Sequence, residues 1–451
     1  MTGRTFINLL MLTQLLFLLS PPAVAFDEDA FISGEYDNDT PSAESDQKGG
    51  ESSKESNADA PEETARTEIA SGPAFSGRFE NQLTLLAMKD DTDKVQKHVY
   101  DYLLIQLDMD AALAKNIELK ADGVARIFAG DAQFGMSEIV PPRTTGRALQ
   151  QNPALAALLM TPYAFENRAW LDNAYVKIPV GNFLLTIGKQ PLGQGAGYVW
   201  NPTDVFVQKD MLDPTYQQEG IVAARLVVPM GRTSFDFVAA SPDNDFDNWV
   251  GGGRFQFPLG PVQFSVVAYH TRTQMINVQN ALNGTPMTNH MRLMMGGDAV
   301  IDFEGVRLWG EAAYNQVKNE KNYTEAEGGL EYYFPFETHL MVEYFYYGRG
   351  PLQQNGSYDL NSWINVLEGQ LKMLGRHFLF ESLEHPVADF WSIGLSSFQA
   401  LSDGSAMVEA DIKWDFTEDA QMWFMVAKGF GGREDFLANS LQSWLRLTMY
   451  Y

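Results

Sequence analysis

The feature that most constrains the fold is a two-residue alternation of apolar and polar side chains that recurs along the chain. In Ile117–Ile127 the apolar residues other than Val124 share one parity, while Glu, Lys, Asp and Arg share the other. Successive side chains of an extended strand point to opposite faces, so this run predicts a strand with one apolar and one charged side. The same pattern recurs in Leu103–Asp110, Met291–Phe303, Glu325–Phe334 and Ala406–Asp415. Each run lasts about ten residues, which is the length of a tilted strand that crosses a bilayer.

The connections between these runs alternate between short and long, as in bacterial outer-membrane barrels. We predict short turns at Leu113–Asn116, Pro179–Asn182, Pro229–Arg232, Pro258–Pro261, Asp302–Gly305, Pro335–Glu337, Glu384–Val387 and Phe416–Asp419. These eight turns and nine longer polar loops, such as 241–248, 274–287 and 348–374, join 18 strands. The predicted fold is an all-β transmembrane antiparallel up-and-down barrel over residues 75–451, with 16 strands as the alternative count.

A soluble β-sandwich is the alternative fold. The number of evenly spaced strands argues against it. The aromatic residues that precede short turns also argue against it, because they are expected for a girdle at a membrane surface. These aromatic residues are Phe257, Phe303, Phe334 and Trp414.

The first 25 residues read as an export signal. Arg4 precedes an apolar run over 6–19, and the small residues of 23–25 form a cleavage site. Residues 26–70 contain 14 acidic and 3 basic residues and few apolar ones, so we expect residues 26–74 to form a disordered acidic segment. No later stretch has 18 consecutive apolar residues, which argues against a membrane-spanning helix. With an even strand count, the acidic segment is expected in the periplasm of a Gram-negative bacterium.

Composition excludes several function classes. The formal net charge is −26, which disfavours nucleic acid as a partner, because binding to phosphates requires clustered Lys and Arg. The chain has no cysteine, which excludes disulfides, thiolate metal sites and covalently attached c-type haem. The six histidines show no metal-ligand pair at helical spacing, and neither Ser265 nor Ser392 can be paired with a histidine from the sequence. We expect no cofactor, no metal and no enzyme activity, with an outer-membrane hydrolase as the least favoured reading.

The C-terminal strand carries the most specific mark. Apolar residues alternate with polar and aromatic ones from Leu441, and the sequence ends on an aromatic residue. This ending resembles the insertion signal that the barrel assembly machinery recognises in outer-membrane proteins. The predicted signal residues are Leu447, Met449 and Tyr451.

The polar strand faces should line the lumen of an 18-stranded barrel, which is wide enough for an aqueous channel. Ten acids and six bases are expected there, which predicts a mildly cation-preferring lumen. The alternative is that these charges pair across strands and stabilise the wall. The predicted channel-lining residues are Glu118, Lys120, Asp122, Arg126, Arg292, Asp298, Arg307, Glu311, Glu325, Glu327, Glu331, Glu343, Glu409, Asp411, Lys413 and Arg446.

Three loops are long enough to hold structure of their own. The loop 129–168 contains an expected helix over 153–160, with Asn152 as its cap and Pro at the first helical position. A second helix is expected over Ser362–Leu374, with one apolar face. These apolar faces must be buried in the lumen as a constriction, against a partner, or on the barrel rim.

The third loop follows the strand 183–190 and carries a motif that runs from Gly-Lys-Gln through a glycine-rich stretch to Asn-Pro-x-Asp. Its marked residues are Gly188, Lys189, Gln190, Asn201, Pro202 and Asp204. This motif resembles the alginate-export-type outer-membrane porins. The resemblance implies an 18-stranded barrel and a basic conduit for an anionic polysaccharide, whereas the lumen predicted here is rich in acids.

The predicted function is an outer-membrane channel for diffusion or export of small hydrophilic solutes or a polymer. The alternative is a barrel sheath or conduit that docks a periplasmic partner, either a polysaccharide assembly or a multihaem cytochrome, through residues 26–74. Membrane lipid and lipopolysaccharide are the other expected partners.

Overall fold

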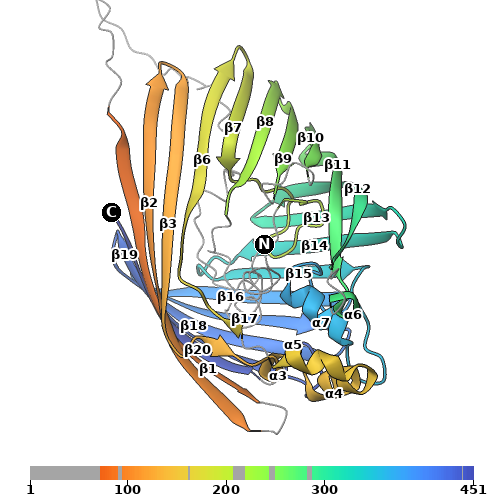
Figure 1. Cartoon of the computed structure of the whole chain (residues 1–451). Coiled ribbons are helices and arrows are strands. Elements are labelled where there is room, and N and C mark those ends of the chain that lie inside the picture. Colours follow the sequence, from red (N-terminus) through yellow and green to blue (C-terminus); the bar gives the residue numbers. More distant parts are fainter. Residues whose placement is uncertain are drawn as a thin grey trace, which may run out of the picture.

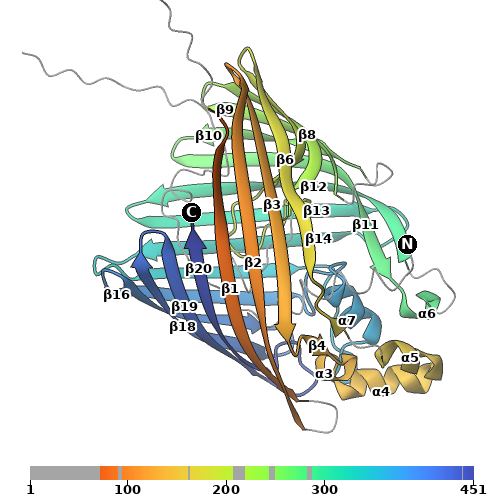
Figure 2. The ribbon, with the colours of Figure 1, turned by 60° about the vertical axis from the view of Figure 1, so that its left-hand side comes forward.

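The computed structural model describes residues 72–89, 94–160, 163–206, 219–242, 249–281, 287–438 and 440–451. Within these ranges, 18 strands form one antiparallel sheet in which each strand pairs with its neighbours along the chain. The first strand also pairs with the last, and this pairing closes the sheet into a barrel. Figure 2 shows β1 and β20 side by side at the closure. The predicted 18-stranded all-β barrel is confirmed, and the alternative strand count and the alternative sandwich fold are excluded.

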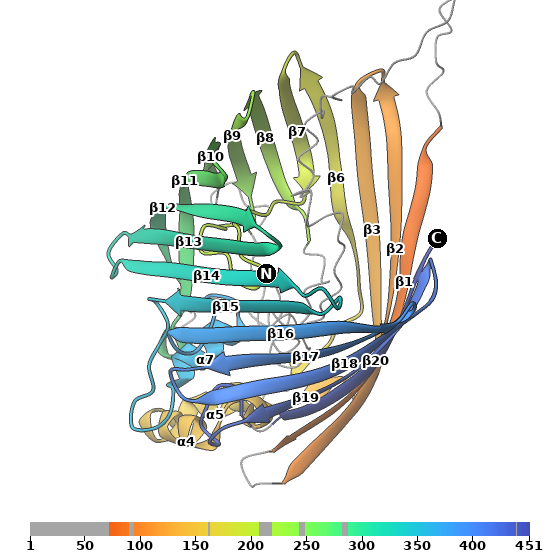
Figure 3. The ribbon, with the colours of Figure 1, turned by 180° about the vertical axis from the view of Figure 1, so that it is seen from behind.

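The strands run between the two barrel ends over lengths that vary widely (Figures 1 and 3). Their bounds are β1 (Ala74–Lys89), β2 (Val95–Ala114), β3 (Ile117–Gly130), β6 (Arg168–Val180), β7 (Phe183–Gln190), β8 (Ile221–Met230), β9 (Thr233–Ser241), β10 (Val250–Leu259), β11 (Val262–Ile276), β12 (Met287–Phe303), β13 (Val306–Val317), β14 (Tyr323–Tyr333), β15 (His339–Tyr347), β16 (His377–Ala388), β17 (Trp391–Ala400), β18 (Ser405–Thr417), β19 (Ala420–Phe430) and β20 (Ser440–Tyr450).

The remaining elements belong to the long loops and gather at one end of the barrel (Figure 1). They are β4 (Gln133–Phe134), which pairs with β5 (Tyr163–Ala164), and the helices α3 (Met136–Ile139), α4 (Pro142–Gln151), η1 (Pro153–Leu155), α5 (Ala156–Leu159), α6 (Val278–Ala281) and α7 (Leu360–Leu367). None of the helices in the described ranges is long and apolar enough to cross a membrane.

Seven of the eight predicted short turns lie at strand ends in the structure, and one is misplaced. The turn expected at Glu384–Val387 is wrong, because β16 continues to Ala388 and the chain reverses at 389–390. The proline within this segment favours a turn because it lacks an N–H donor. Pro386 instead lies where the register between β16 and β17 shifts, and such an irregularity tolerates a missing donor.

The alternating pattern places apolar side chains outside the barrel and polar ones inside. In β18, Glu409, Asp411 and Lys413 are buried, whereas Ile412 and Trp414 are exposed. An exposed apolar face of this extent suits hydrocarbon rather than water. Exposed aromatic residues flank the apolar zone near the turns (Phe183, Phe303, Phe336, Phe390, Trp391, Trp414 and Phe416) and near the loops (Trp249, Tyr314, Tyr344 and Phe430).

The two expected loop helices differ in outcome. The helix at 153–160 is present as η1 followed by α5, and the Asn152 side chain accepts a hydrogen bond from the Ala154 N–H (3.1 Å). The helix expected over Ser362–Leu374 is too long, because α7 ends at Leu367. Gly369 has a φ of 69°, a left-handed conformation that favours glycine and stops the helix.

The C-terminal residue takes part in closing the barrel. Tyr451 and Gly77 exchange two backbone hydrogen bonds, and the Tyr451 hydroxyl donates to the Gln106 carbonyl (3.0 Å). Leu447 and Met449 lie on the outer face of β20, on the parity opposite to the buried Trp444 and Arg446. The predicted signal peptide and the acidic segment up to residue 71 lie outside the described residues, as do the acidic side chains of 243–248.

Candidate functional site: an inward-folded loop held by wall carboxylates

The segment 191–206 turns into the barrel where β7 ends, and Figure 1 shows it inside the ring of strands. Gln190 is buried at this point, and its side-chain amide donates to the Ala223 carbonyl (3.0 Å). Gly188 has a φ of 128°, and a Cβ there would lie 2.3 Å from the Ala174 carbonyl oxygen. Only glycine fits this backbone, so the glycine of the predicted motif fixes how the chain leaves the wall.

Glu343 on β15 is the principal anchor of the segment. Its carboxylate accepts backbone hydrogen bonds from the N–H groups of Tyr198 (2.9 Å), Val199 (3.1 Å) and Trp200 (2.7 Å). The Glu343 side chain is 0% exposed. A buried carboxylate requires donors on its oxygens, and here consecutive backbone N–H groups of the loop supply them.

Glu311 on β13 is the second anchor. It accepts hydrogen bonds from the N–H groups of Ala196 (2.8 Å) and Thr203. Glu311 therefore holds the two ends of the 196–203 stretch, and Glu343 holds its middle.

Glu311 belongs to a row of acids on neighbouring strands. Asp298, Glu311 and Glu327 are direct register partners across β12, β13 and β14. Adjacent like charges are destabilising unless each is compensated. Asp298 pairs with Arg254 (2.9 Å), and Glu327 accepts a hydrogen bond from the Trp309 indole N–H (3.1 Å). The loop N–H groups of Ala196 and Thr203 fill the same compensating role for Glu311, the remaining acid of the row.

Trp200 packs the loop against the aromatic part of the wall. Its ring stacks on Phe345 with a centroid distance of 5.1 Å, and Phe398 and Phe378 lie at 5.6 and 6.3 Å. Trp200 is 4% exposed. The loop is thus held both by polar contacts and by apolar burial.

The other motif residues shape the loop internally. Asp204 accepts hydrogen bonds from the N–H groups of Gln194 (3.0 Å) and Phe206 (2.8 Å), which closes the segment into a compact turn. A Cβ on Gly197 would lie 1.9 Å from the Trp200 carbonyl oxygen. The glycine-rich composition therefore reflects close backbone packing. Lys189 lies at the wall and pairs with Glu219 (2.5 Å).

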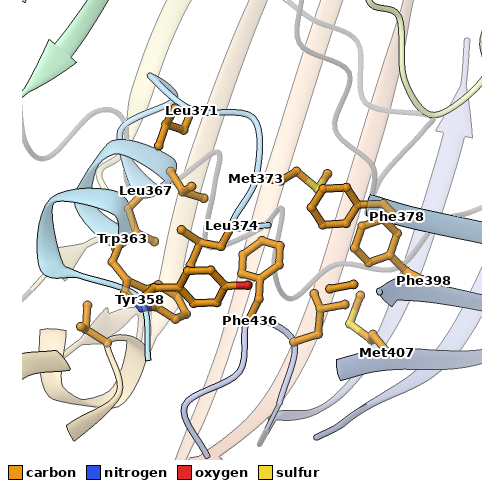
Figure 4. Packing of buried hydrophobic residues seen from close by; sticks show 14 of the residues in the cluster. Tyr358, Trp363, Leu367, Leu371, Met373, Leu374, Phe378, Phe398, Met407 and Phe436 are labelled. Atoms are coloured by element: carbon orange, nitrogen blue, oxygen red, sulfur yellow. The ribbon is translucent and has the colours of Figure 1, made fainter. Parts of the chain in front are cut away.

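A second connection, 348–376, also folds inward and packs beside the first. Leu367 and Leu374 are fully buried and belong to one apolar cluster with Phe378, Phe398 and Met407 of the wall (Figure 4). The apolar face expected over Ser362–Leu374 is therefore buried inside the barrel, which is one of the three placements that the sequence left open.

Lys372 connects the two inward-folded loops. Its ammonium group contacts Glu325 of β14 (2.5 Å) and the Asn201 carbonyl (3.4 Å). The Asn-Pro part of the motif is therefore linked to the second loop through a single lysine.

The helices outside the strands cover the loop end of the barrel. Thr144 of α4 donates to the Tyr358 carbonyl (2.7 Å), and the Arg143 N–H donates to Glu434 (3.2 Å). Asn152 donates to Gln279 of α6 (2.8 Å). Four long loops therefore support one another over the mouth.

Glu368 follows α7 and is 1% exposed. Within the part of the chain that the structure describes, its Oε2 atom is buried without a hydrogen-bond partner. Burial disfavours the charged form and raises the pKa of Glu368 from 4.5 to about 8.

This raised pKa predicts a pH-dependent stability. Between pH 4.5 and about pH 8, Glu368 keeps its proton in the folded state but releases it in the unfolded state. The free energy of unfolding therefore falls as the pH rises. The slope is at most about 1.4 kcal/mol per pH unit. Denaturant unfolding of the refolded protein and of Glu368→Gln should give equal stability near pH 4.5 and a more stable variant near pH 8. Parallel pH profiles would contradict the prediction.

The structure separates the predicted channel-lining residues into two groups. Lys120, Asp122, Arg126, Arg292 and Arg307 are partly exposed, and Glu118 is exposed. The others are buried and contact either the inward loops or other wall groups: Asp298, Glu311, Glu325, Glu327, Glu331, Glu343, Glu409, Asp411, Lys413 and Arg446.

Pairing across the wall accounts for several of the buried charges. Glu331 contacts His339 (2.9 Å), Lys413 contacts Glu384 (3.0 Å), and Arg446 lies 3.7 Å from Glu80. For these residues the alternative considered from the sequence applies, in which charges pair across strands and stabilise the wall. No three His, Asp or Glu side chains of the described ranges are grouped as a metal site.

Sequence reasoning missed Trp200 and Lys372 as functional residues. Trp200 lies inside the glycine-rich motif, but nothing in the sequence assigns it a role. Lys372 is the one charge in the apolar stretch 371–374, and an isolated charge in such a stretch is a signal that it has a buried partner.

No protein-family model and no curated protein matches the sequence. Among solved structures, the chain is similar to OccAB1 of Acinetobacter baumannii, with 9% identity, 84% of this chain and 96% of that chain covered, and a TM-score of 0.47. It is also similar to OccK11 of Pseudomonas aeruginosa, with 11% identity, coverage of 83% and 95%, and a TM-score of 0.46. A third is a loop-deletion mutant of OmpT of Vibrio cholerae, with 10% identity, coverage of 84% and 99%, and a TM-score of 0.40.

Proposed function

We propose that this chain is an outer-membrane channel for small hydrophilic solutes, with a constriction formed by residues 191–206 and 348–376. The observation that carries the proposal is the anchoring of a loop inside a closed barrel by Glu311 and Glu343, each of which lies in the middle of its strand. A barrel of this strand number is wide enough to conduct unless loops narrow it. The exposed apolar belt between two aromatic bands supports the membrane location.

The burial pattern favours anions over cations as permeant ions. Eight of the ten acids expected in the lumen are buried, which leaves Glu118 and Asp122 with solvent contact. Four of the six bases keep partial exposure: Lys120, Arg126, Arg292 and Arg307. Buried, compensated carboxylates contribute little field to a water-filled path, whereas solvated cations attract anions. We therefore propose weak anion preference in place of the cation preference expected from composition.

Planar-bilayer recordings of the refolded protein test both the channel and its anion preference. A salt gradient should give discrete conductance steps and a reversal potential of the sign that anion flow produces. Absence of conductance at every potential would refute the channel. A reversal potential of the sign that cation flow produces would be consistent with the channel but would refute the proposed anion preference.

The alginate-export-type resemblance adds one class of cargo to this proposal, an anionic polymer. Among the sixteen residues predicted to line the channel, those with solvent contact are net basic, which is compatible with such a cargo. Blockage of the conductance by an added anionic polysaccharide, but not by a neutral one of equal length, would support it.

A further inference from the structure

The inner wall formed by β3 and β6 carries two arginines side by side. Arg126 of β3 and Arg168 of β6 are direct register partners, so their Cβ atoms lie about 5 Å apart. Like charges in this position destabilise the strand pair unless they are compensated. Arg126 is partly exposed and Arg168 is exposed, so an anion from solution can compensate both guanidinium groups at once.

Both guanidinium groups lie over the indole ring of Trp170. The Cζ atom of Arg168 is 4.7 Å from the ring centroid, and the Cζ atom of Arg126 is 5.8 Å from it. Arg126 also lies over the ring of Tyr102, at 5.6 Å. The indole N–H donates to the buried carboxylate of Asp172 (3.3 Å), which fixes the orientation of the ring. These contacts hold two cations and one aromatic face together before a solute binds.

The charges around the arginine pair leave a surplus of positive charge. Glu219 pairs with Arg168 (2.9 Å) and also with Lys189 (2.5 Å), so one carboxylate serves two cations. Asp172 is a second acid beside these groups, whereas Asp122 lies about 13 Å from the arginine pair along β3. The pair and Lys189 thus place three bases beside two acids. This surplus favours a monoanion such as a carboxylate over a phosphate group, which carries about two charges.

The arginine pair lies on the wall opposite the anchored loop. β3 is half-way round the 18-stranded ring from β14. Glu311 and Glu343, which hold the segment 191–206, lie on the two strands that flank β14. Lys120 and Asp122 of β3 are partly exposed, so this wall keeps contact with solvent. A solute that passes the anchored loop therefore meets the wall of β2, β3 and β6, which lie side by side in Figure 2.

We propose that Arg126, Arg168 and Trp170 form a binding site for a carboxylate carried on a ring with a flat apolar face. The site rests on the proposed channel function, because it faces the lumen. The planar guanidinium groups present N–H donors in the paired geometry that a carboxylate accepts, and the bound anion relieves the repulsion between them. The ring of the solute packs against the exposed part of Trp170. Aromatic acids and sugar acids share this chemistry.

Isothermal titration calorimetry on the detergent-folded protein measures this binding without relying on conductance. Benzoate and glucuronate represent the two kinds of ring, acetate lacks the ring, and benzyl alcohol lacks the carboxylate. Benzoate or glucuronate should bind at least about tenfold more tightly than acetate and benzyl alcohol, and the tighter of the two identifies the kind of ring. Acetate binding as tightly as both ring-bearing acids overturns the proposal, and so does a lack of binding by either acid.

Substitutions locate the binding on the wall. Arg168→Gln changes an exposed residue at the first position of β6, so the barrel should fold, and the affinity for the tighter acid should fall about tenfold. Arg126→Lys keeps the charge but loses the planar group, and it should weaken the same acid several-fold. The matched control is Arg225→Gln, which removes an inner-wall arginine that is already paired with Asp236 (3.0 Å) and should leave the affinity unchanged.

Two results with these variants would refute the site. One is an unchanged affinity in Arg168→Gln. The other is an equal loss in Arg225→Gln, which would mean that net charge rather than this site attracts the acid. A protein that binds the acid but does not conduct keeps the site and refutes the channel, whereas a protein that conducts without binding the acid refutes the site alone.

Discussion

Replacing Glu343 by alanine should release the inward-folded loop and raise the single-channel conductance. The substitution leaves the N–H groups of 198–200 without their acceptor inside the barrel. Each such group costs about 1–3 kcal/mol when it stays buried, so the loop is expected to move toward water. The barrel wall keeps its backbone pairing. We expect a loss of about 2–4 kcal/mol in the free energy of unfolding, because the loop leaves its packed position.

Two variants make this result interpretable. Glu343→Gln keeps an acceptor oxygen at the same place, so its single-channel conductance should be close to that of the wild type. Glu418→Ala removes an exposed acid in the turn between β18 and β19, which holds no part of the loop, and should leave conductance unchanged. Equal conductance for Glu343→Ala and the wild type would show that the segment 191–206 does not limit the pore.

Replacing Trp200 by alanine should cost about 3–5 kcal/mol of unfolding free energy, because a buried indole leaves a cavity that the rigid wall cannot fill. The substitution removes the packing of the indole ring against Phe345, Phe378 and Phe398. The conductance should rise as in the Glu343 variant, since Trp200 and Glu343 hold the same segment. Denaturant unfolding followed by circular dichroism measures the destabilisation without depending on the removed fluorophore.

The effects of Trp200 and Glu343 should also be non-additive, because the two residues fix one loop. The double variant should therefore lose less unfolding free energy than the sum of the two single variants. Trp249→Ala, at an exposed position near the loop end, should leave the conductance unchanged. Fully additive effects would mean that the two residues stabilise different parts of the protein.

The barrel itself could be predicted because its signals are local. Alternation with period two reports which residues share a strand face, and Gly, Pro and Asn mark reversals within a few residues. The strand 183–190 is predicted with its observed bounds. The turn near Pro386 is misplaced because proline signals a missing donor but does not show whether a local irregularity accommodates it.

The candidate site could be predicted only in part. The sequence shows that Glu311 and Glu343 lie on the polar faces of strands, and that a glycine-rich segment follows Gln190. It does not show that they meet, because the Trp200 N–H and the Glu343 carboxylate are 143 residues apart. The prediction of channel-lining acids follows from strand parity alone, which cannot reveal what covers a side chain.

The sequence by itself determined the class of fold, the number of strands and the face on which each charge lies, because these follow from neighbours along the chain. The tertiary structure alone decided which charges meet solvent. Closing the barrel brings β13, β14 and β15 opposite the loop after β7, and the adjacent carboxylates there need donors that they cannot supply to one another. Backbone N–H groups of the loop supply them, so acids predicted to line a channel instead anchor an inward-folded loop.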